Sequence, residues 1–245
     1  KPPPAAAALL VYSVGTDAGK VALYEATAAR HGVATTAMLG LGGAWRGPDI
    51  TKGPSGGFKF ELLRAALAAA ADDALVVFTD SYDVYWNAPL PDAAALAAIL
   101  ARRGCSLLFA AETRCWPTGC DGSDYPRPAA DDRSPYRYLN SGCFLGRAAT
   151  IKKLVAGVAA DDDDQRRCHA FYAAEVNSGS RDVQIDATCE LFQCLGGVET
   201  LPRGELELRG GRFGDCIANA RYGTVPVAVH GNGGRSVKRS WEALA

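Results

Sequence analysis

The chain has 245 residues, of which 48% are hydrophobic, so it is long enough for one large domain or two small ones with a substantial core. Its 26 basic and 27 acidic side chains leave a net charge of −1 without a concentrated basic block. This balance argues against nucleic acid or an anionic membrane as the main partner. The longest apolar stretch, residues 5–12, is far shorter than the roughly 20 residues that span a bilayer.

The first eight residues form a Pro- and Ala-rich leader, and we expect residues 9–245 to form a single domain. Because the sequence begins with Lys1, we expect a processed or excised piece whose signal peptide or anchor is not in view. The eight cysteines include no Cys-x-x-Cys pair, which weakens a zinc or thioredoxin-like interpretation. Their even number is compatible with disulfides and with the secretory pathway.

The chain opens with a β-α-β pattern. Leu9–Gly15 is an apolar run typical of a buried strand, and residues 34–39 are a second candidate strand. Between them, Val21, Tyr24 and Ala28 recur at helical spacing. Two strands joined by a helix favour a parallel sheet.

A Gly- and Pro-rich loop follows at residues 40–57, and unstructured loops of this length inside a domain are usually functional. Trp45 in this loop is compatible with two roles: stacking on a base or sugar, or pinning the loop to the core. Beyond the loop, Phe60, Leu63 and Leu67 predict a helix.

Two carboxylates follow the next apolar run. Residues 75–79 predict a buried strand, which leads directly into Asp80 and Asp83 in a D-x-x-D spacing. In open α/β sheets, ligands bind beyond the carboxyl ends of the strands, and paired carboxylates suit a hard divalent cation. The alternative is a helix-capping aspartate followed by a solvated one.

The middle of the chain continues the alternation of helices and strands. Residues 91–103 predict a helix, and residues 106–111 predict a strand with Glu112 at its carboxyl end. In the irregular segment that follows, Cys115 and Cys120 are compatible with a local disulfide or with two buried thiols.

Polar residues also precede the next strand. Asn140 and Ser141 stand before a short apolar strand, where they either offer an amide and a hydroxyl to a ligand or simply cap the strand. The acidic run Asp161–Asp164 is typical of a solvated helix start or linker, and the alternative is a pocket wall. Beyond it, we expect helices at residues 166–175 and 186–195.

The last part of the chain carries a candidate third metal ligand. Residues 198–201 and 206–208 are candidate strands, and residues 225–229 predict a strand that delivers His230 into a Gly-rich turn. His230 therefore stands at a strand end, as Asp80 does. Together with the D-x-x-D turn and a turn that lets phosphate approach the backbone, it is a reasonable metal ligand.

With these pieces in order, the chain resembles the N-terminal glycosyltransferase domain of the multifunctional procollagen-lysine hydroxylase (lysyl hydroxylase, PLOD) family. The resemblance covers about residues 9–240, in the family's order. The matching segments are LGLGGAWRGPD, GGFK, FTDSYDVYWNAP, AETRCWP, YRYLNSGCFLG, DDDDQ, FQCLGG and VPVAVHGNG.

The resemblance implies a GT-A-like glycosyltransferase fold, which is an α/β fold with a Rossmann-type, mostly parallel sheet flanked by helices. It implies a Mn²⁺ ion held by Asp80, Asp83 and His230. The residues implied to bind the UDP-sugar are Val14, Gly15, Thr16, Trp45, Ile50, Lys59, Asp80, Ser81, Tyr82, Asn232, Gly233, Gly234, Arg235 and Ser236. Those implied to line the sugar and acceptor pocket are Cys115, Trp116, Asn140, Asp163 and Asp164, the last three with catalytic roles.

The reaction implied is retaining, Mn²⁺-dependent transfer of glucose from UDP-glucose to galactosyl-hydroxylysine of collagen-like proteins, in the lumen of the endoplasmic reticulum or after secretion. One alternative is transfer of galactose or glucose to a different acceptor. Another is a UDP-sugar-binding module without turnover. The chain departs from the family's Pro-Thr-Lys segment at Gly234, Arg235 and Ser236, which puts donor affinity in question.

Overall fold

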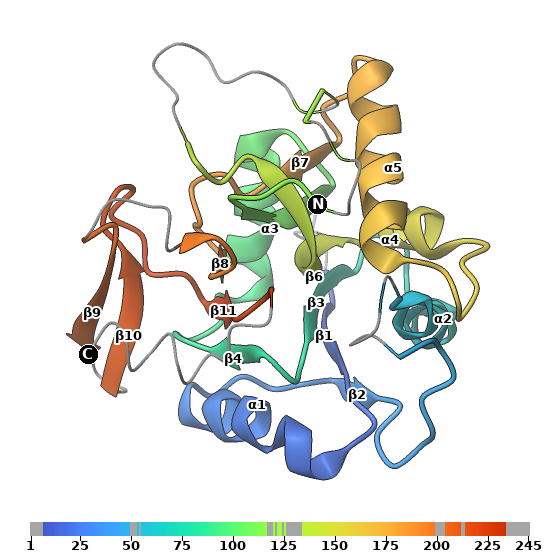
Figure 1. Ribbon diagram of the computed structural model, residues 1–245, viewed down its shortest axis with the longest axis horizontal. Coiled ribbons are helices and arrows are strands. Elements are labelled where there is room, and N and C mark those ends of the chain that lie inside the picture. The colour runs from blue at the N-terminus through green and yellow to red at the C-terminus, as the bar shows by residue number, and fades with distance from the viewer. Residues whose placement is uncertain are drawn as a thin grey trace, which may run out of the picture.

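The computed structural model of the protein describes residues 7–49, 53, 55–116, 120, 122–123, 125, 134–198, 204–211 and 214–233. Over these residues the chain forms a six-stranded sheet, a three-stranded sheet beside it and a two-stranded hairpin (Figure 1). No described helix has both the length and the apolar composition needed to cross a membrane.

The six-stranded sheet is mostly parallel, as predicted. Its order is β2 (Ala37–Leu39), β1 (Leu9–Val14), β3 (Leu75–Asp80), β6 (Tyr138–Arg147), β5 (Leu107–Glu112) and β7 (Val183–Ile185). Neighbouring strands are parallel except for β6, which runs antiparallel to both β3 and β5. Strands β3 and β5 are buried along almost their whole length, which explains their continuous apolar runs.

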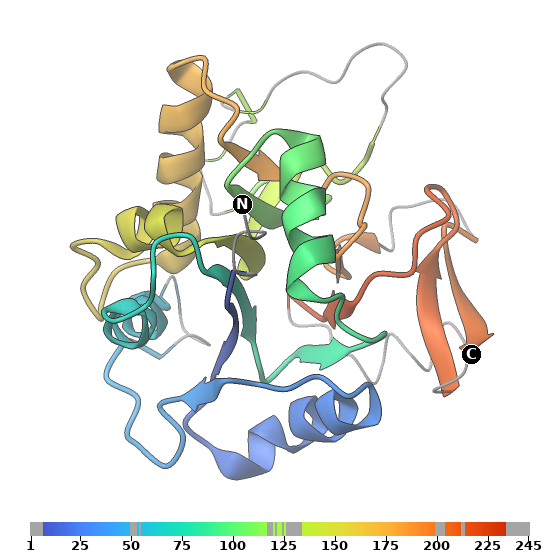
Figure 2. The same cartoon turned by 180° about the vertical axis from the view of Figure 1, so that it is seen from behind.

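Helices cover both faces of this sheet (Figures 1 and 2). They are α1 (Ala18–Arg30), α2 (Gly57–Leu67), α3 (Ala93–Arg103), α4 (Ala148–Val155) and α5 (Asp164–Asn177). Helices α2, α4 and α5 share one apolar core with Phe78 and Phe144, whereas α1 and α3 share the other core with Val77 and Leu145. Alternate residues of β3 and β6 therefore point into opposite cores.

The second sheet is small but places the last part of the chain beside the first sheet. Its order is β4 (Val84–Trp86), β11 (Ala228–His230) and β8 (Phe192–Cys194). The hairpin of β9 (Leu206–Gly211) and β10 (Gly214–Asn219) lies on the outer side of this sheet (Figure 1). The apolar residues that join hairpin and sheet are Tyr85, Leu195, Leu206, Ile217 and Val229.

The helix predicted at residues 186–195 is wrong, because this segment is a turn followed by β8. The buried carboxylate of Asp186 accepts hydrogen bonds from the backbone N–H groups of Glu190, Leu191 and Phe192. Since an aspartate that binds nearby backbone groups competes with a helix, the apolar spacing of this segment is overridden.

Two further expectations need correction. Asn140 and Ser141 do not precede a short strand; they lie inside the ten-residue strand β6. The sequence-based prediction also missed β4, β7, β10 and α4. Residues 199–201 of one candidate strand lie outside the described residues.

Candidate functional site

A turn between the two sheets carries the paired carboxylates. Asp80 is the last residue of β3, and Asp83 immediately precedes β4, so residues 81–83 lead the chain from one sheet into the other. His230 ends β11 and is the partner of Val84 in β4. The backbone N–H of Gly231 donates to the carbonyl of Asp83 at 2.7 Å, which fixes the strand end against the turn.

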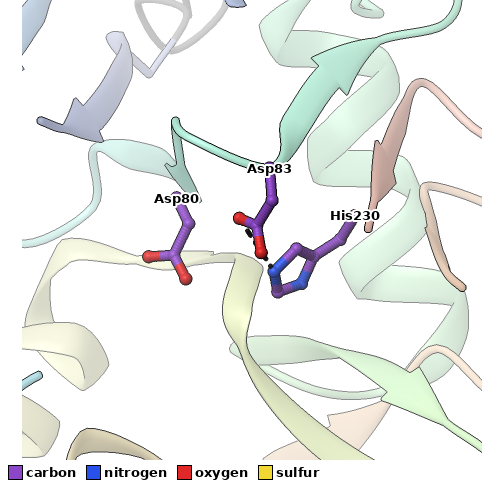
Figure 3. A group of neighbouring side chains, drawn as sticks. All are labelled: Asp80, Asp83 and His230. Atoms are coloured by element: carbon purple, nitrogen blue, oxygen red, sulfur yellow. Dashed lines mark ion pairs between the residues drawn. The ribbon is translucent and has the colours of Figure 1, made fainter. Parts of the chain in front are cut away.

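These three side chains converge (Figure 3). One ligand atom from each of Asp80, Asp83 and His230 lies within 4.8 Å of the others. His230 Nε2 is 3.3 Å from Asp83 Oδ1. Two carboxylates and one imidazole form a donor set suited to a divalent cation such as Mn²⁺, so the residues present fit the metal that the family resemblance implies.

Strand β6 passes directly beneath this group at Gly142. A Cβ atom at this position would lie 2.2 Å from His230 Cε1, 2.7 Å from His230 Nδ1 and 2.9 Å from Asp80 Oδ2. Such distances are well inside van der Waals contact. The sequence SGC therefore places a glycine where any side chain would displace the candidate metal ligands.

A chain of buried amides and a carboxylate orients His230 from behind. His230 Nδ1 is 2.9 Å from Asn140 Oδ1, and Asn140 Nδ2 donates to Glu112 Oε1 at 3.0 Å. Glu112 Oε2 in turn accepts from Asn232 Nδ2 at 2.9 Å. When Nδ1 carries the proton and donates to Asn140, Nε2 is free to bind a metal, which is how outer partners usually fix a metal-binding histidine.

The cation nearest Asp80 is the buried side chain of Lys59 from α2. Its Nζ lies 2.9 Å from Asp80 Oδ1 and 2.7 Å from Asp164 Oδ2. Ser141 Oγ also donates to Asp164 Oδ2. Lys59 thus joins the candidate metal ligand on β3 to the acidic run at the start of α5.

The charges of this group perturb one another. Burial opposes the charged form of Lys59, but Asp164 and Asp80 outweigh it and raise the pKa of the lysine above its ordinary value. Burial raises the pKa of Asp80, although Lys59 acts in the opposite direction. For His230, burial opposes protonation, but Asp83 outweighs it and raises the pKa of the imidazole.

The residues expected to hold the nucleotide gather at the carboxyl ends of β1 and β3. Ser81 Oγ donates to the carbonyl of Val14. Tyr82 Oη accepts from the backbone N–H of Thr16 at 2.9 Å. A Cβ at Gly15 would lie 2.6 Å from Ser81 Oγ, so the two turns need a glycine to approach this closely.

Trp45 lies in the loop before α2. It is half-buried, stacks edge-on against Phe58 with ring centroids 5.2 Å apart and donates from Nε1 to the carbonyl of Pro48 at 3.0 Å. These contacts pin part of the indole to the loop and to α2. Tyr82, which the resemblance also assigns to the nucleotide, is 45% exposed.

The residues expected around the acceptor lie near the start of α5. A disulfide joins Cys115 and Cys120, which settles the alternative left open by the sequence. Trp116 is 49% exposed, and its carbonyl lies 3.4 Å from Gln165 Nε2. Asp163 caps α5 by accepting from the backbone N–H of Arg166, so the acidic run is both a helix start and part of a buried wall through Asp164.

Of the remaining predicted site residues, the structure describes two. Asn232 and Gly233 follow β11, and Asn232 is bound to Glu112 and to the backbone N–H of Gly196. Ile50, Gly234, Arg235 and Ser236 lie outside the described residues.

Sequence reasoning missed how Glu112, Ser141 and Gln165 take part in the site. The position of Glu112 at the carboxyl end of a strand was a signal, because Asp80 ends its own strand at the same edge. The bonds of Ser141 and Gln165 carried no such signal, since they depend on where α5 meets β6.

Comparison with known proteins gives the family. The profile of the PLOD GT domain family matches residues 5–241. The chain is 33% identical over 198 residues to a procollagen-lysine,2-oxoglutarate 5-dioxygenase of Drosophila melanogaster, covering 80% of this chain and 26% of that protein. It is 33% identical over 229 residues to the human multifunctional procollagen lysine hydroxylase and glycosyltransferase LH3, covering 92% of this chain and 30% of that protein.

A solved structure supports the fold. A glycosyltransferase involved in the glycosylation of the major capsid of PBCV-1 superposes with a TM-score of 0.50 at 10% identity, covering 96% of this chain and 98% of the other. The chain thus spans less than a third of the two curated relatives described, and nearly all of the structural neighbour. Together with the mostly parallel sheet, these matches establish that the chain belongs to the PLOD GT domain family and is a glycosyltransferase domain with a GT-A-like fold.

Proposed function

We propose that this domain transfers glucose from UDP-glucose to galactosyl-hydroxylysine of collagen-like proteins, with Mn²⁺ as cofactor and with retention at the anomeric carbon. The observation that carries the proposal is the convergence of Asp80, Asp83 and His230 at the edge where the two sheets meet. The names of the relatives, which include procollagen lysine hydroxylase and glycosyltransferase, support the acceptor class. They also favour the secretory pathway, where such acceptors are made.

Asp80, Asp83 and His230 would hold the metal through two carboxylate oxygens and the imidazole Nε2. Bound there, the ion would supply Lewis-acid stabilisation of the charge that develops on the departing diphosphate. Asn140 keeps His230 in the orientation that presents Nε2, and Gly142 leaves room for it.

Residues at the carboxyl ends of β1 and β3 would bind the uridine. The turn after β1 brings Gly15 and Thr16 against Ser81 and Tyr82, so the backbone is held close to the site by side-chain hydrogen bonds. Tyr82 and Trp45 offer aromatic surface that suits a base or a ribose. Lys59 would contribute positive charge on the diphosphate side.

The start of α5 would form the sugar and acceptor wall. Asp164 is held by Lys59 and Ser141, so its carboxylate has a fixed orientation. Asp163 uses Oδ1 to cap α5, while its Oδ2 accepts no hydrogen bond from the described residues and lies 3.7 Å from Arg166 Nε. That oxygen is buried, so Asp163 would act here through its charge, because carboxylates near an anomeric carbon stabilise oxocarbenium character.

The test is release of UDP from a panel of UDP-sugars, measured with Mn²⁺ and with EDTA. We expect UDP-glucose turnover that EDTA abolishes. Asp83→Asn should reduce kcat/KM by about a hundredfold or more, because one carboxylate ligand is lost while the side-chain shape is kept. Asp73→Asn, at the exposed opposite end of β3, is the matched control and should retain wild-type turnover.

Each alternative has its own outcome. Metal-independent turnover, or an Asp83→Asn variant as active as the control, would contradict the proposed metal site. Binding of UDP-glucose without any turnover would indicate a binding module. The domain could turn over UDP-glucose but transfer glucose only to acceptors other than deglucosylated collagen peptides. That outcome would support the proposed donor and contradict the proposed acceptor.

A further inference from the structure

Strand β6 has an edge that its neighbour β3 does not cover. The last pair between these strands is Thr79 with Cys143, because β3 turns away at Asp80 into the candidate metal site. Residues 138–142 of β6 therefore lose their backbone partner on that side. This uncovered edge carries Ser141, whose hydroxyl donates to Asp164 of the proposed acceptor wall.

The amide of Gln165 covers this edge as a neighbouring strand would. Its Oε1 accepts from the backbone N–H of Ser141 at 2.7 Å, and its Nε2 donates to the carbonyl of Leu139 at 2.6 Å. The N–H of Leu139 donates to Tyr125 Oη at 3.2 Å on the same edge. A side-chain amide has one donor and one acceptor side, so it reproduces the pattern of a backbone peptide group.

Gln165 also connects the parts assigned to the acceptor. It lies in the first turn of α5, directly after Asp163 and Asp164, and is itself buried. Its Nε2 is 3.4 Å from the carbonyl of Trp116, which belongs to the disulfide-closed loop. One side chain therefore contacts β6 and Trp116 from the helix that begins with Asp164.

We propose that Gln165 is a positioning residue for the acceptor: it fixes the start of α5 and Trp116 against β6, and so sets the space available to the acceptor beside the acidic wall. This proposal rests on the proposed glycosyl transfer. Within the part of the chain that the structure describes, no hydrogen bond or ion pair joins Gln165 to the candidate metal ligands, which Lys59 and Asn140 support instead. Loss of the amide should therefore act on the acceptor and leave the donor side in place.

The test is Gln165→Met, which keeps the length of the side chain and removes both hydrogen bonds to β6. We expect KM for the glycosylated peptide acceptor to rise about tenfold, because two buried backbone groups lose their partners and β6 is no longer fixed to α5. KM for UDP-glucose and the rate of UDP release to water should stay within about twofold of wild type. A purely structural role would instead lower transfer and hydrolysis together.

Gln184→Met is the matched control. The amide of Gln184 also donates to two backbone carbonyls, those of Arg103 and Arg181, but Gln184 belongs to β7, the edge strand of the six-stranded sheet. We expect wild-type kinetics from it. If Gln165→Met does not fold by circular dichroism, Gln165→Glu retains the acceptor for the Ser141 N–H, loses the donor to Leu139 and should show the same rise in acceptor KM.

The outcomes separate the two proposals. If wild type releases UDP from no donor, the proposed function is overturned and the role of Gln165 with it. If wild type transfers sugar and Gln165→Met or Gln165→Glu changes donor and acceptor parameters equally, or neither, only the role of Gln165 is overturned. A selective rise in acceptor KM supports it.

Discussion

At the scale of single residues, Lys59 shows how the site tolerates several acids. Three carboxylates, Asp80, Asp83 and Asp164, lie close together, and such groups repel one another unless cations intervene. Lys59 lies between two of them and His230 faces the third. Removing Lys59 would leave Asp80 and Asp164 near each other without this cation, so the lysine supports both carboxylates.

Glu112 makes the stability of the protein depend on pH. Burial raises the pKa of Glu112 to about 7, and the hydrogen bonds from Asn140 and Asn232 only partly offset this effect. A carboxyl whose pKa is higher in the folded state favours folding when protonated. Its contribution is complete below the unfolded pKa near 4.5 and is lost as pH rises through about 7.

Between pH 4.5 and pH 7.5, we therefore expect the unfolding free energy of the wild type to fall by about 3 kcal/mol more than that of Glu112→Gln. The measurement is urea denaturation across this range in metal-free buffer. Glu25→Gln, an exposed position on α1, should keep the wild-type slope. An unchanged slope in Glu112→Gln would contradict the pKa assigned to this carboxyl.

The residues of the site were predicted unevenly, for a physical reason. Asp80 and His230 stand at strand ends with apolar runs before them, so the sequence alone makes both candidates for one metal site, although the structure places them in different sheets. The partner of Lys59 was not predictable, because Asp164 comes from a helix start more than a hundred residues later. Asn140 was expected to face the ligand, whereas its amide is already bound to His230 and Glu112.

At the scale of elements, the disulfide between Cys115 and Cys120 closes the loop that carries Trp116. The other six cysteines are free. Denatured, unreduced protein should therefore titrate six thiols, and reduced protein should titrate eight.

Cys120→Ser should lower the unfolding free energy by at most about 2 kcal/mol, since the closed loop is short and constrains little of the unfolded chain. Cys216→Ser, a partly exposed free thiol on β10, is the control and should be neutral. A wild-type thiol count below six would show that further pairs form.

Elements with strong local signals were predicted well. Asp92 and Gly104 mark the two ends of α3, as expected. Asp92 accepts a hydrogen bond from the N–H of Ala95, and Gly104 adopts the left-handed conformation. The segment after β7 was misread because Asp186, which is buried and paired with Arg103, organises it through backbone hydrogen bonds. Such long-range pairing is invisible to a periodicity argument.

At the scale of the whole molecule, one buried amide ties the small sheet to the hairpin. Asn87 Nδ2 donates to the carbonyls of Ile217 and Pro226, at 2.9 and 2.8 Å, and Oδ1 accepts from the N–H of Ile217 at 2.8 Å. Asn87 follows β4, Ile217 lies in β10, and Pro226 precedes β11. The side chain therefore links three elements around the strand that carries His230.

Asn87→Ala should lower the unfolding free energy by about 3 kcal/mol, because it leaves three buried backbone groups without partners. Chemical denaturation measures this loss directly. Asn177→Ala, at the exposed end of α5, should cost well under 1 kcal/mol. Equal effects of the two substitutions would contradict this linking role of Asn87.

The distance along the chain between the two halves of the metal site has a consequence for synthesis. The six-stranded sheet is complete once Ile185 in β7 is available, and His230 follows 45 residues later. Domains can fold as the chain emerges from the ribosome. The strands of the main sheet and both aspartates therefore emerge before His230 does. A nascent chain stalled before β11 would hold all six strands of the main sheet and both aspartates without the histidine, so the proposed metal site would be complete only after β11 has been made.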